Sequence, residues 1–205
     1  PHSAASKWRG WHCRRHSMSF KGEITDLTAI DFKAMQTANK TMLRMHLTNR
    51  RIESLPANIF APLQSLKHLD LHLNRTRLPS NIFDALTNLE HLSIYTYQEE
   101  IAQTLFSRLS NLKYLKLHIR PTKSRLKPQQ RECKEYEIPT DHQRPVHRLI
   151  TTSLLRPLTQ LEYLSISCEC ASIHQDTFRY QRQLRTLVLK TNVSAFPPDL
   201  FRGLH

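Results

Sequence analysis

The sequence predicts an α/β solenoid, a fold in which short coils of chain stack on one another along one axis. Two observations support this fold: apolar residues recur with a fixed period, and most phenylalanines occupy one position of that period. Leucines at residues 66, 89 and 112 lie 23 residues apart, as do those at 161 and 184. Six of the eight phenylalanines share one repeat position, at residues 32, 60, 83, 106, 178 and 201.

The first half of each repeat has the spacing of a strand that is buried on one face. In the pattern L-x-x-L-x-L, as at Leu66, Leu69 and Leu71, the leucines point inward and the residues between them point outward. One such strand cannot bury its own apolar edge. Neighbouring coils are therefore expected to stack their strands into a curved parallel sheet on the concave side.

The second half of each repeat is expected to return along the convex side as loops or short helical turns. One return contains Leu78-Pro79, Phe83 and Leu86, and equivalent residues recur in register in other repeats. An array of amphipathic helices with leucines at helical spacing would not keep Pro, Phe and Leu in that register. The sequence therefore predicts a leucine-rich-repeat solenoid in which the phenylalanines stack from coil to coil as a spine.

Position nine of each repeat lies where the strand bends, and it normally holds an inward-pointing Asn that binds main-chain groups. In this chain the position holds Arg50, Asn74, Tyr97, Arg120, Glu169 and Asn192. Because only two of these six residues are Asn, buried main-chain groups at the bend need other partners, such as Thr, Ser or water.

We expect four segments along the chain. They are an irregular, cap-like segment at 1–17, repeats at 18–119, a basic loop insertion at 120–148, and repeats at 149–205 that are truncated at the C-terminus. The insertion is inferred because 49 residues separate Leu112 from Leu161 without a visible strand pattern between 121 and 148. Trp8 and Trp11 lie beside arginines, which is compatible with nucleic-acid stacking, but a cap over the first coil is the favoured interpretation.

Composition and charge leave several classes of partner open. The chain has 30 Lys and Arg against 17 Asp and Glu, a net charge of +13, and 12 His. Such an excess of basic residues favours an acidic partner, namely an acidic protein surface, an anionic glycan or nucleic acid. The alternative is a solvated basic surface that has no ligand. The hydrophobic content of 39% is too high for a disordered chain, and we expect no membrane span because the apolar runs are short.

Two pairs of segments resemble the amino-terminal repeats of insect Toll-type receptor ectodomains, an extracellular leucine-rich-repeat family. They are residues 50–60 with 66–74 and residues 78–83 with 86–94, which carry Leu-Pro-Ala-Asn and Leu-Pro-Ser-x-x-Phe returns. The resemblance implies a receptor ectodomain fragment in innate immune or developmental signalling, on the extracellular side of the membrane or secreted. It further implies a protein ligand similar to a cystine-knot cytokine, or an anionic pattern, and it is compatible with a receptor dimer.

Two other functions remain open. The first is an intracellular leucine-rich-repeat scaffold for protein–protein interaction, with a cytoplasmic location. The second, less favoured, is a basic solenoid that binds nucleic acid, for which affinity would fall steeply with salt.

The candidate ligand-binding surface is the concave face, built from the outward-pointing strand residues. They are Arg44, His46, His68, Asp70, His72, His91, Tyr95, Tyr114, Lys116, His118 and Tyr163. Because imidazole titrates near pH 6.5, acidification would make this face more positive and favour an anionic partner. The alternative is that exposed strand faces simply tolerate His.

No pattern in the sequence predicts a catalytic residue, a metal site or a cofactor. His68 and His72 are four residues apart, which on a strand is roughly 13 Å, too far for two ligands of one zinc ion. Cys168-Glu-Cys170 does not have the C-x-x-C spacing of a redox motif. The sequence therefore predicts a binding protein and not an enzyme.

The cysteines and the glycosylation sequons bear on the compartment. Cys133 could form a disulfide with Cys168 or Cys170, and free thiols are the alternative. Of the three sequons, those at Asn74 and Asn192 fall at the inward-pointing ninth position. We therefore expect modification at Asn39 alone, if the chain is secreted. A glycan or an intact disulfide would favour the receptor interpretation, and reduced thiols the intracellular scaffold.

Overall fold

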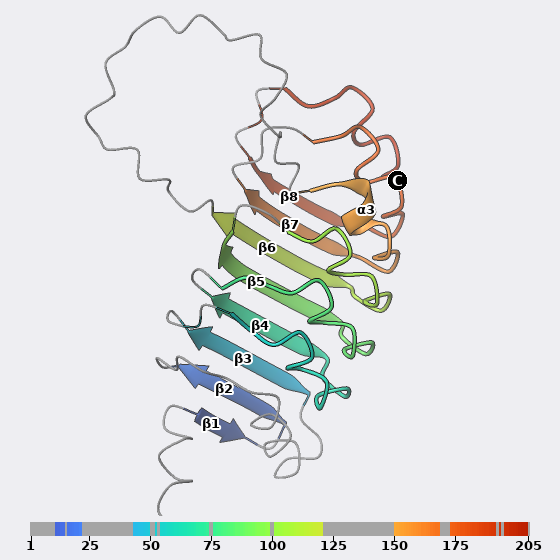
Figure 1. Ribbon diagram of the computed structural model, residues 1–205. Helices are drawn as coiled ribbons and strands as arrows, with labels where there is room; N and C mark the ends of the chain where they lie inside the picture. Colours follow the sequence, from blue (N-terminus) through green and yellow to red (C-terminus); the bar gives the residue numbers. More distant parts are fainter. Residues whose placement is uncertain are drawn as a thin grey trace, which may run out of the picture.

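The computed structural model confirms the predicted solenoid (Figure 1). It describes residues 11–14, 16–21, 43–49, 52, 54–73, 76–98, 101–120, 150–168, 173–191, 193 and 195–204. In this part of the chain the strands form one 8-stranded sheet whose spatial order follows the sequence. The strands are β1 (Trp11–Arg14), β2 (Ser17–Lys21), β3 (Arg44–Asn49), β4 (His68–Leu73), β5 (His91–Tyr97), β6 (Tyr114–Arg120), β7 (Tyr163–Cys168) and β8 (Thr186–Lys190).

Strands β2 to β8 are parallel and pair at equivalent positions of the repeat. Leu69 lies opposite Leu92, and Leu92 lies opposite Leu115, so inward side chains of successive coils meet. These three leucines are at most 1% exposed. The 23-residue period thus determines both the register of the sheet and the composition of its core.

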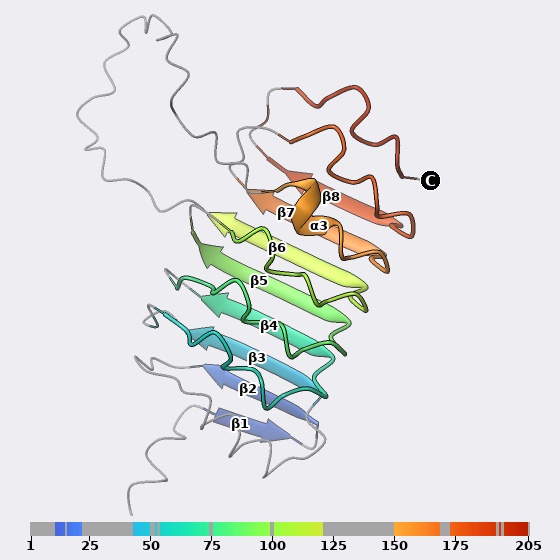
Figure 2. The same cartoon turned by 45° about the vertical axis from the view of Figure 1, so that its right-hand side comes forward.

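The return segments cross one face of the sheet (Figure 2). Phenylalanines form the predicted spine along these segments. The ring centroids of Phe60 and Phe83 lie 6.1 Å apart, and those of Phe83 and Phe106 lie 6.4 Å apart, in both cases with stacked rings. The spine is interrupted where Leu155 takes the place of Phe in α3 (Thr152–Leu155), a short helix that begins after the N-cap Thr151. Phe32 lies outside the described residues.

The strands bear on two of the predicted segments, the loop insertion at 120–148 and the cap-like segment at 1–17. β6 pairs directly with β7, which is the next strand along the described part of the chain. The predicted loop insertion lies outside the described residues, apart from its first residue, Arg120. Within the segment 1–17, predicted to be irregular and cap-like, β1 occupies Trp11–Arg14 and pairs antiparallel with β2 at the end of the sheet. The repeat pattern does not indicate this strand, because its pairing depends on the open edge of β2.

The side chains that bind main-chain groups at the bend of each coil do not form a ladder of Asn residues. Of the six residues at position nine, the structure describes Tyr97 and Arg120, and both side chains are exposed. Main-chain groups near the bend are bound by other residues, as expected: the buried Thr76 hydroxyl donates to the carbonyl of Ile52. The Gln98 side chain also accepts from the Leu78 amide at 3.5 Å, a role that the sequence did not indicate.

Side chains of alternating charge form a ladder along the side of the sheet where the strands begin. The repeat pattern did not indicate this ladder. Its members each precede the first residue of a strand: Lys67, Glu90, Lys113, Glu162 and Arg185. The ion pairs are 2.8 Å from Lys67 Nζ to Glu90 Oε1, 3.6 Å from Lys113 Nζ to Glu90 Oε2, and 3.8 Å from Arg185 Nε to Glu162 Oε2. Between these ion pairs, the Glu162 amide donates to the Lys113 carbonyl at 2.8 Å, a backbone contact that places the two charged residues on neighbouring strands.

Candidate ligand-binding face

The outward side chains of β3 to β8 form three rows across the concave face, the sheet face opposite the return segments. The first row is Arg44, His68, His91, Tyr114, Tyr163 and Thr186; the middle row is His46, Asp70, Ser93, Lys116, Ser165 and Val188; the third row is Thr48, His72, Tyr95, His118, Ser167 and Lys190. All eleven candidate residues predicted from the sequence lie in these rows. That they bind a ligand stays a prediction.

The first row is a continuous stack of rings. The ring centroids of His68 and His91 are 4.3 Å apart, those of His91 and Tyr114 are 5.3 Å apart, and those of Tyr114 and Tyr163 are 4.3 Å apart. Parallel strands bring the rings into contact because equivalent residues lie about 4.8 Å apart in the sheet. The stack presents a rigid aromatic edge across four strands.

The third row carries a second, more tilted series of rings. His72 and Tyr95 have centroids 4.3 Å apart, and Tyr95 and His118 are 5.1 Å apart. At the end of the series, Arg120 Nε donates to His118 Nε2 at 2.9 Å. Sequence reasoning did not find this contact, although both residues lie on β6 at alternate positions.

Charged groups lie between the two ring series. The Lys116 ammonium is 5.2 Å from the centroid of the Tyr95 ring, and a hydrogen bond with Tyr95 raises the pKa of Lys116. Asp70 Oδ2 lies 3.9 Å from His46 Nδ1. Ser93 and Ser165 are short and buried, so the rings and the charged groups carry the exposed chemistry of this face.

Burial against neighbouring rings sets the titration of the concave histidines. Desolvation is the main cause that lowers the pKa of His68, His72, His91 and His118 below 6.5. Nearby cations add to this effect, for example Arg120 beside His118 and Arg44 beside His68. These four histidines therefore acquire their charge at a lower pH than an unperturbed imidazole does.

Few of the other predicted site residues are described. Asn39, Cys133 and Cys170 lie outside the described residues. Cys168 is buried and disulfide-bonded. Cys13, on β1, lies six strands away, roughly 29 Å at 4.8 Å per strand, far beyond disulfide reach. That Cys133 or Cys170 takes part in this bond stays a prediction.

The described residues contain neither a cluster of metal ligands nor a membrane-spanning helix. No group of three or more His, Cys, Asp or Glu is placed there to hold a metal ion. In the same residues, no helix has the length and apolarity needed to cross a bilayer.

Comparisons with known proteins agree with this geometry. A model of the BspA type leucine rich repeat region matches six copies over residues 12–125 and 147–205. No curated protein matches the chain in sequence. Among solved structures, the chain is similar to one in the Toll–Spatzle complex of Drosophila, with a TM-score of 0.69 and 18% identity over 92% of this chain and 22% of that one.

The chain is also similar to one in the TLR13–ssRNA13 complex, with a TM-score of 0.51 and 16% identity over 91% of this chain and 27% of that one. At such identities the likeness concerns the fold, and the chain spans well under half the length of either receptor. The family match covers most of the chain and agrees with the parallel sheet of stacked coils. The chain belongs to the BspA-type leucine-rich-repeat family.

Proposed function

We propose that this chain is an extracellular ligand-recognition module of a Toll-like receptor ectodomain, and that it binds a protein ligand on its concave face. The observation that carries the proposal is the pair of ring series, His68 to Tyr163 and His72 to His118, with Lys116 between them. Tyr and Arg are enriched among the residues that dominate protein interfaces, because they bury large area and make hydrogen bonds. Rings that already contact one another lose little side-chain entropy on binding.

Two further observations support the receptor role over an intracellular scaffold. Cys168 is disulfide-bonded, which favours an oxidising, extracellular compartment. The fold resembles that of Toll in its complex with Spatzle, so a protein ligand, similar to a cystine-knot cytokine, is the proposed partner. A ligand with an acidic surface fits the net charge of +13.

The experiment compares binding of two probes, recombinant Spatzle and a single-stranded RNA, by surface plasmon resonance. Tyr114→Ala removes a ring from the first row, and we expect it to weaken protein binding by about tenfold or more, as central aromatic residues do. Tyr180→Ala is the matched control, because Tyr180 is an exposed ring outside the concave face. Equal effects of the two substitutions would contradict a concave site, and binding of RNA alone would favour the nucleic-acid alternative.

A further inference from the structure

Three arginines occupy one repeat position on the return segments of the last three coils. Arg156, Arg179 and Arg202 each directly follow a residue of the spine position, namely Leu155, Phe178 and Phe201. The three preceding coils hold Ala61, Asp84 and Ser107 at the same position. The arginines are therefore a feature of this end of the solenoid and not of the repeat. We call these three residues the return-side arginine row.

Contacts between the coils show that the row is continuous in space. Phe178 and Phe201, which precede two of the arginines, stack with centroids 6.4 Å apart. The backbones beside them are close as well, since a Cβ on Gly203 would lie 2.9 Å from the Arg179 Cα. The Arg156 guanidinium lies 5.5 Å from the centroid of the Tyr180 ring on the next coil. The row thus runs along the solenoid axis, and the 6.4 Å between the rings of Phe178 and Phe201 gives the pitch of the spine to which it is attached.

The row is exposed and its positive charge is not neutralised by a close partner. Within the described residues, none of the three arginines takes part in an ion pair. Asp176 precedes Arg179 by three residues, but its carboxylate lies 3.7 Å from His174 Nδ1 instead. Asp199 stands in the same relation to Arg202 and likewise makes no ion pair in the described part of the chain. Three guanidinium groups therefore remain available to an external anion.

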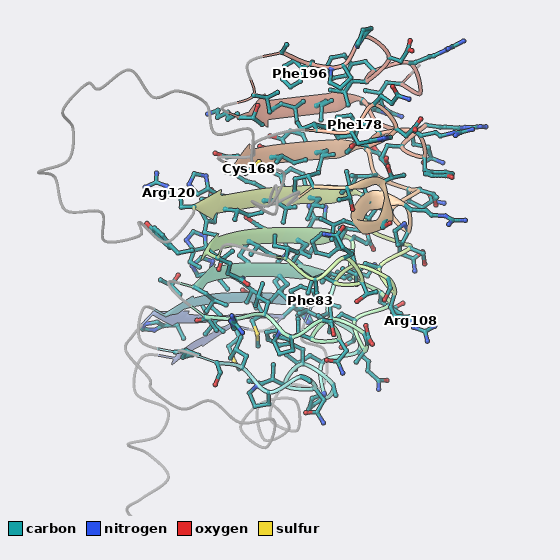
Figure 3. All side chains as sticks on the ribbon, turned by 45° about the horizontal axis from the view of Figure 1, so that its top comes forward. Phe83, Arg108, Arg120, Cys168, Phe178 and Phe196 are labelled. Atoms are coloured by element: carbon teal, nitrogen blue, oxygen red, sulfur yellow. The ribbon has the colours of Figure 1, made fainter. Side chains whose placement is uncertain are left out.

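A fourth arginine extends the basic surface. Arg108 lies one position further along the return segment of the preceding coil, and its side chain is exposed. Figure 3 shows Arg108 projecting outward from the return segments where the strands begin, whereas Arg120 lies at the opposite ends of the strands. The basic surface on the return side is therefore separate from the concave face.

The geometry points to a second binding surface, at which the return-side arginine row holds an extended acidic peptide lying along the solenoid axis. In an extended peptide, residues i and i+2 point to the same side and lie about 6.7 Å apart. This spacing is close to the 6.4 Å between the stacked rings of Phe178 and Phe201. Carboxylates at every second residue can thus meet successive guanidinium groups, which bind carboxylates through two parallel hydrogen bonds.

A peptide fits this surface better than a single-stranded nucleic acid does. Sequence-independent binding of single strands relies on a series of aromatic side chains on which bases stack. The exposed rings near the arginine row are Tyr180, Phe196 and Phe201. The guanidinium of Arg156 already lies against Tyr180, and Phe196 contacts Phe201 edge to face, so these rings do not form a series of parallel faces for bases. The series of rings lies on the opposite face of the sheet.

The test measures fluorescence anisotropy of labelled peptides at low salt. The probe is a ten-residue peptide of alternating Glu and Thr, compared with a peptide that has the same number of glutamates at every third residue. We expect the alternating peptide to bind more tightly, because only its carboxylates match the pitch of the row. The triple variant Arg156→Gln, Arg179→Gln, Arg202→Gln should weaken its binding by about tenfold, since each exposed pair contributes modestly.

A charge-matched control separates this surface from the overall basic charge of the chain. The triple variant Arg77→Gln, Lys113→Gln, Arg120→Gln removes the same charge at exposed residues outside both the arginine row and the concave rows, and it should change peptide binding less than twofold. Circular dichroism verifies that both variants are folded. Equal losses in the two variants, or equal affinity for the two peptides, would overturn the proposal. Stronger binding of a sulfated oligosaccharide or an oligothymidylate of equal charge would overturn the assignment to a peptide.

Discussion

Thr177 occupies a core position that is aliphatic in every other described coil, and replacing it by Val should stabilise the fold. The equivalent residues are Ile59, Ile82, Leu105, Leu154 and Leu200, all at most 1% exposed. Thr177 is also fully buried, and its hydroxyl makes no hydrogen bond within the described residues. Thr177→Val nearly preserves the shape of the side chain and removes the unsatisfied hydroxyl.

The magnitude follows from the cost of burying a hydroxyl without a partner. Mutational data place that cost at about 1–3 kcal/mol, so we expect the free energy of unfolding to rise by about 1–2 kcal/mol. For a chain of this size the corresponding rise in Tm is about 2–8 °C. Urea unfolding followed by circular dichroism measures the first quantity, and differential scanning calorimetry measures the second.

Thr76 provides a matched control, because it is equally buried but its hydroxyl donates to the carbonyl of Ile52. Thr76→Val should therefore destabilise the fold by about 1 kcal/mol. Opposite signs for the two substitutions would support the reasoning. If Thr177→Val also destabilised the fold by about 1 kcal/mol, the hydroxyl of Thr177 would have a partner and the argument would be refuted.

Three more predictions follow. Gln181→Leu should raise the urea midpoint by less than Thr177→Val does, because it removes an Oε1 without a hydrogen bond in the described residues but also the bond from Nε2 to the Leu155 carbonyl at 2.7 Å. Phe83→Ala should lower the free energy of unfolding by about 3–5 kcal/mol, and Phe201→Ala by clearly less, since Phe201 is 43% exposed. Between pH 7.5 and 5.5 the fold should lose stability, because four concave histidines have lowered pKa values and the unfolded chain binds more protons. Over the same range, affinity for an acidic ligand should rise, and an affinity independent of pH would contradict a role for these histidines.

The position of the concave side chains could be predicted because a single period determines the whole sheet. Once Leu69 and Leu92 are assigned to equivalent positions, the neighbours of His68 and His72 follow from strand alternation alone. The stacking of His91 on Tyr114 is a direct consequence of the same register.

The remaining features depend on interactions that the repeat does not encode. The antiparallel pairing of β1 is determined by an open sheet edge, and the bond from Arg120 to His118 depends on side-chain rotamers. The polar core residues Thr177 and Gln181 are visible in the sequence as departures from the aliphatic pattern. Only the structure shows that the Thr177 hydroxyl and the Gln181 Oε1 make no hydrogen bond within the described residues.

The alternating ladder from Lys67 to Arg185 has a consequence for assembly of the coils. The residue that precedes each strand from β4 to β8 carries a charge opposite in sign to that of its neighbours in this series. If a coil were skipped during folding, Lys67 would face Lys113, or Glu90 would face Glu162, and like charges would repel at close range. The leucine patterns of the strands are nearly identical and would by themselves allow such a mispairing. The alternating charges therefore favour pairing of the strands in their sequence order.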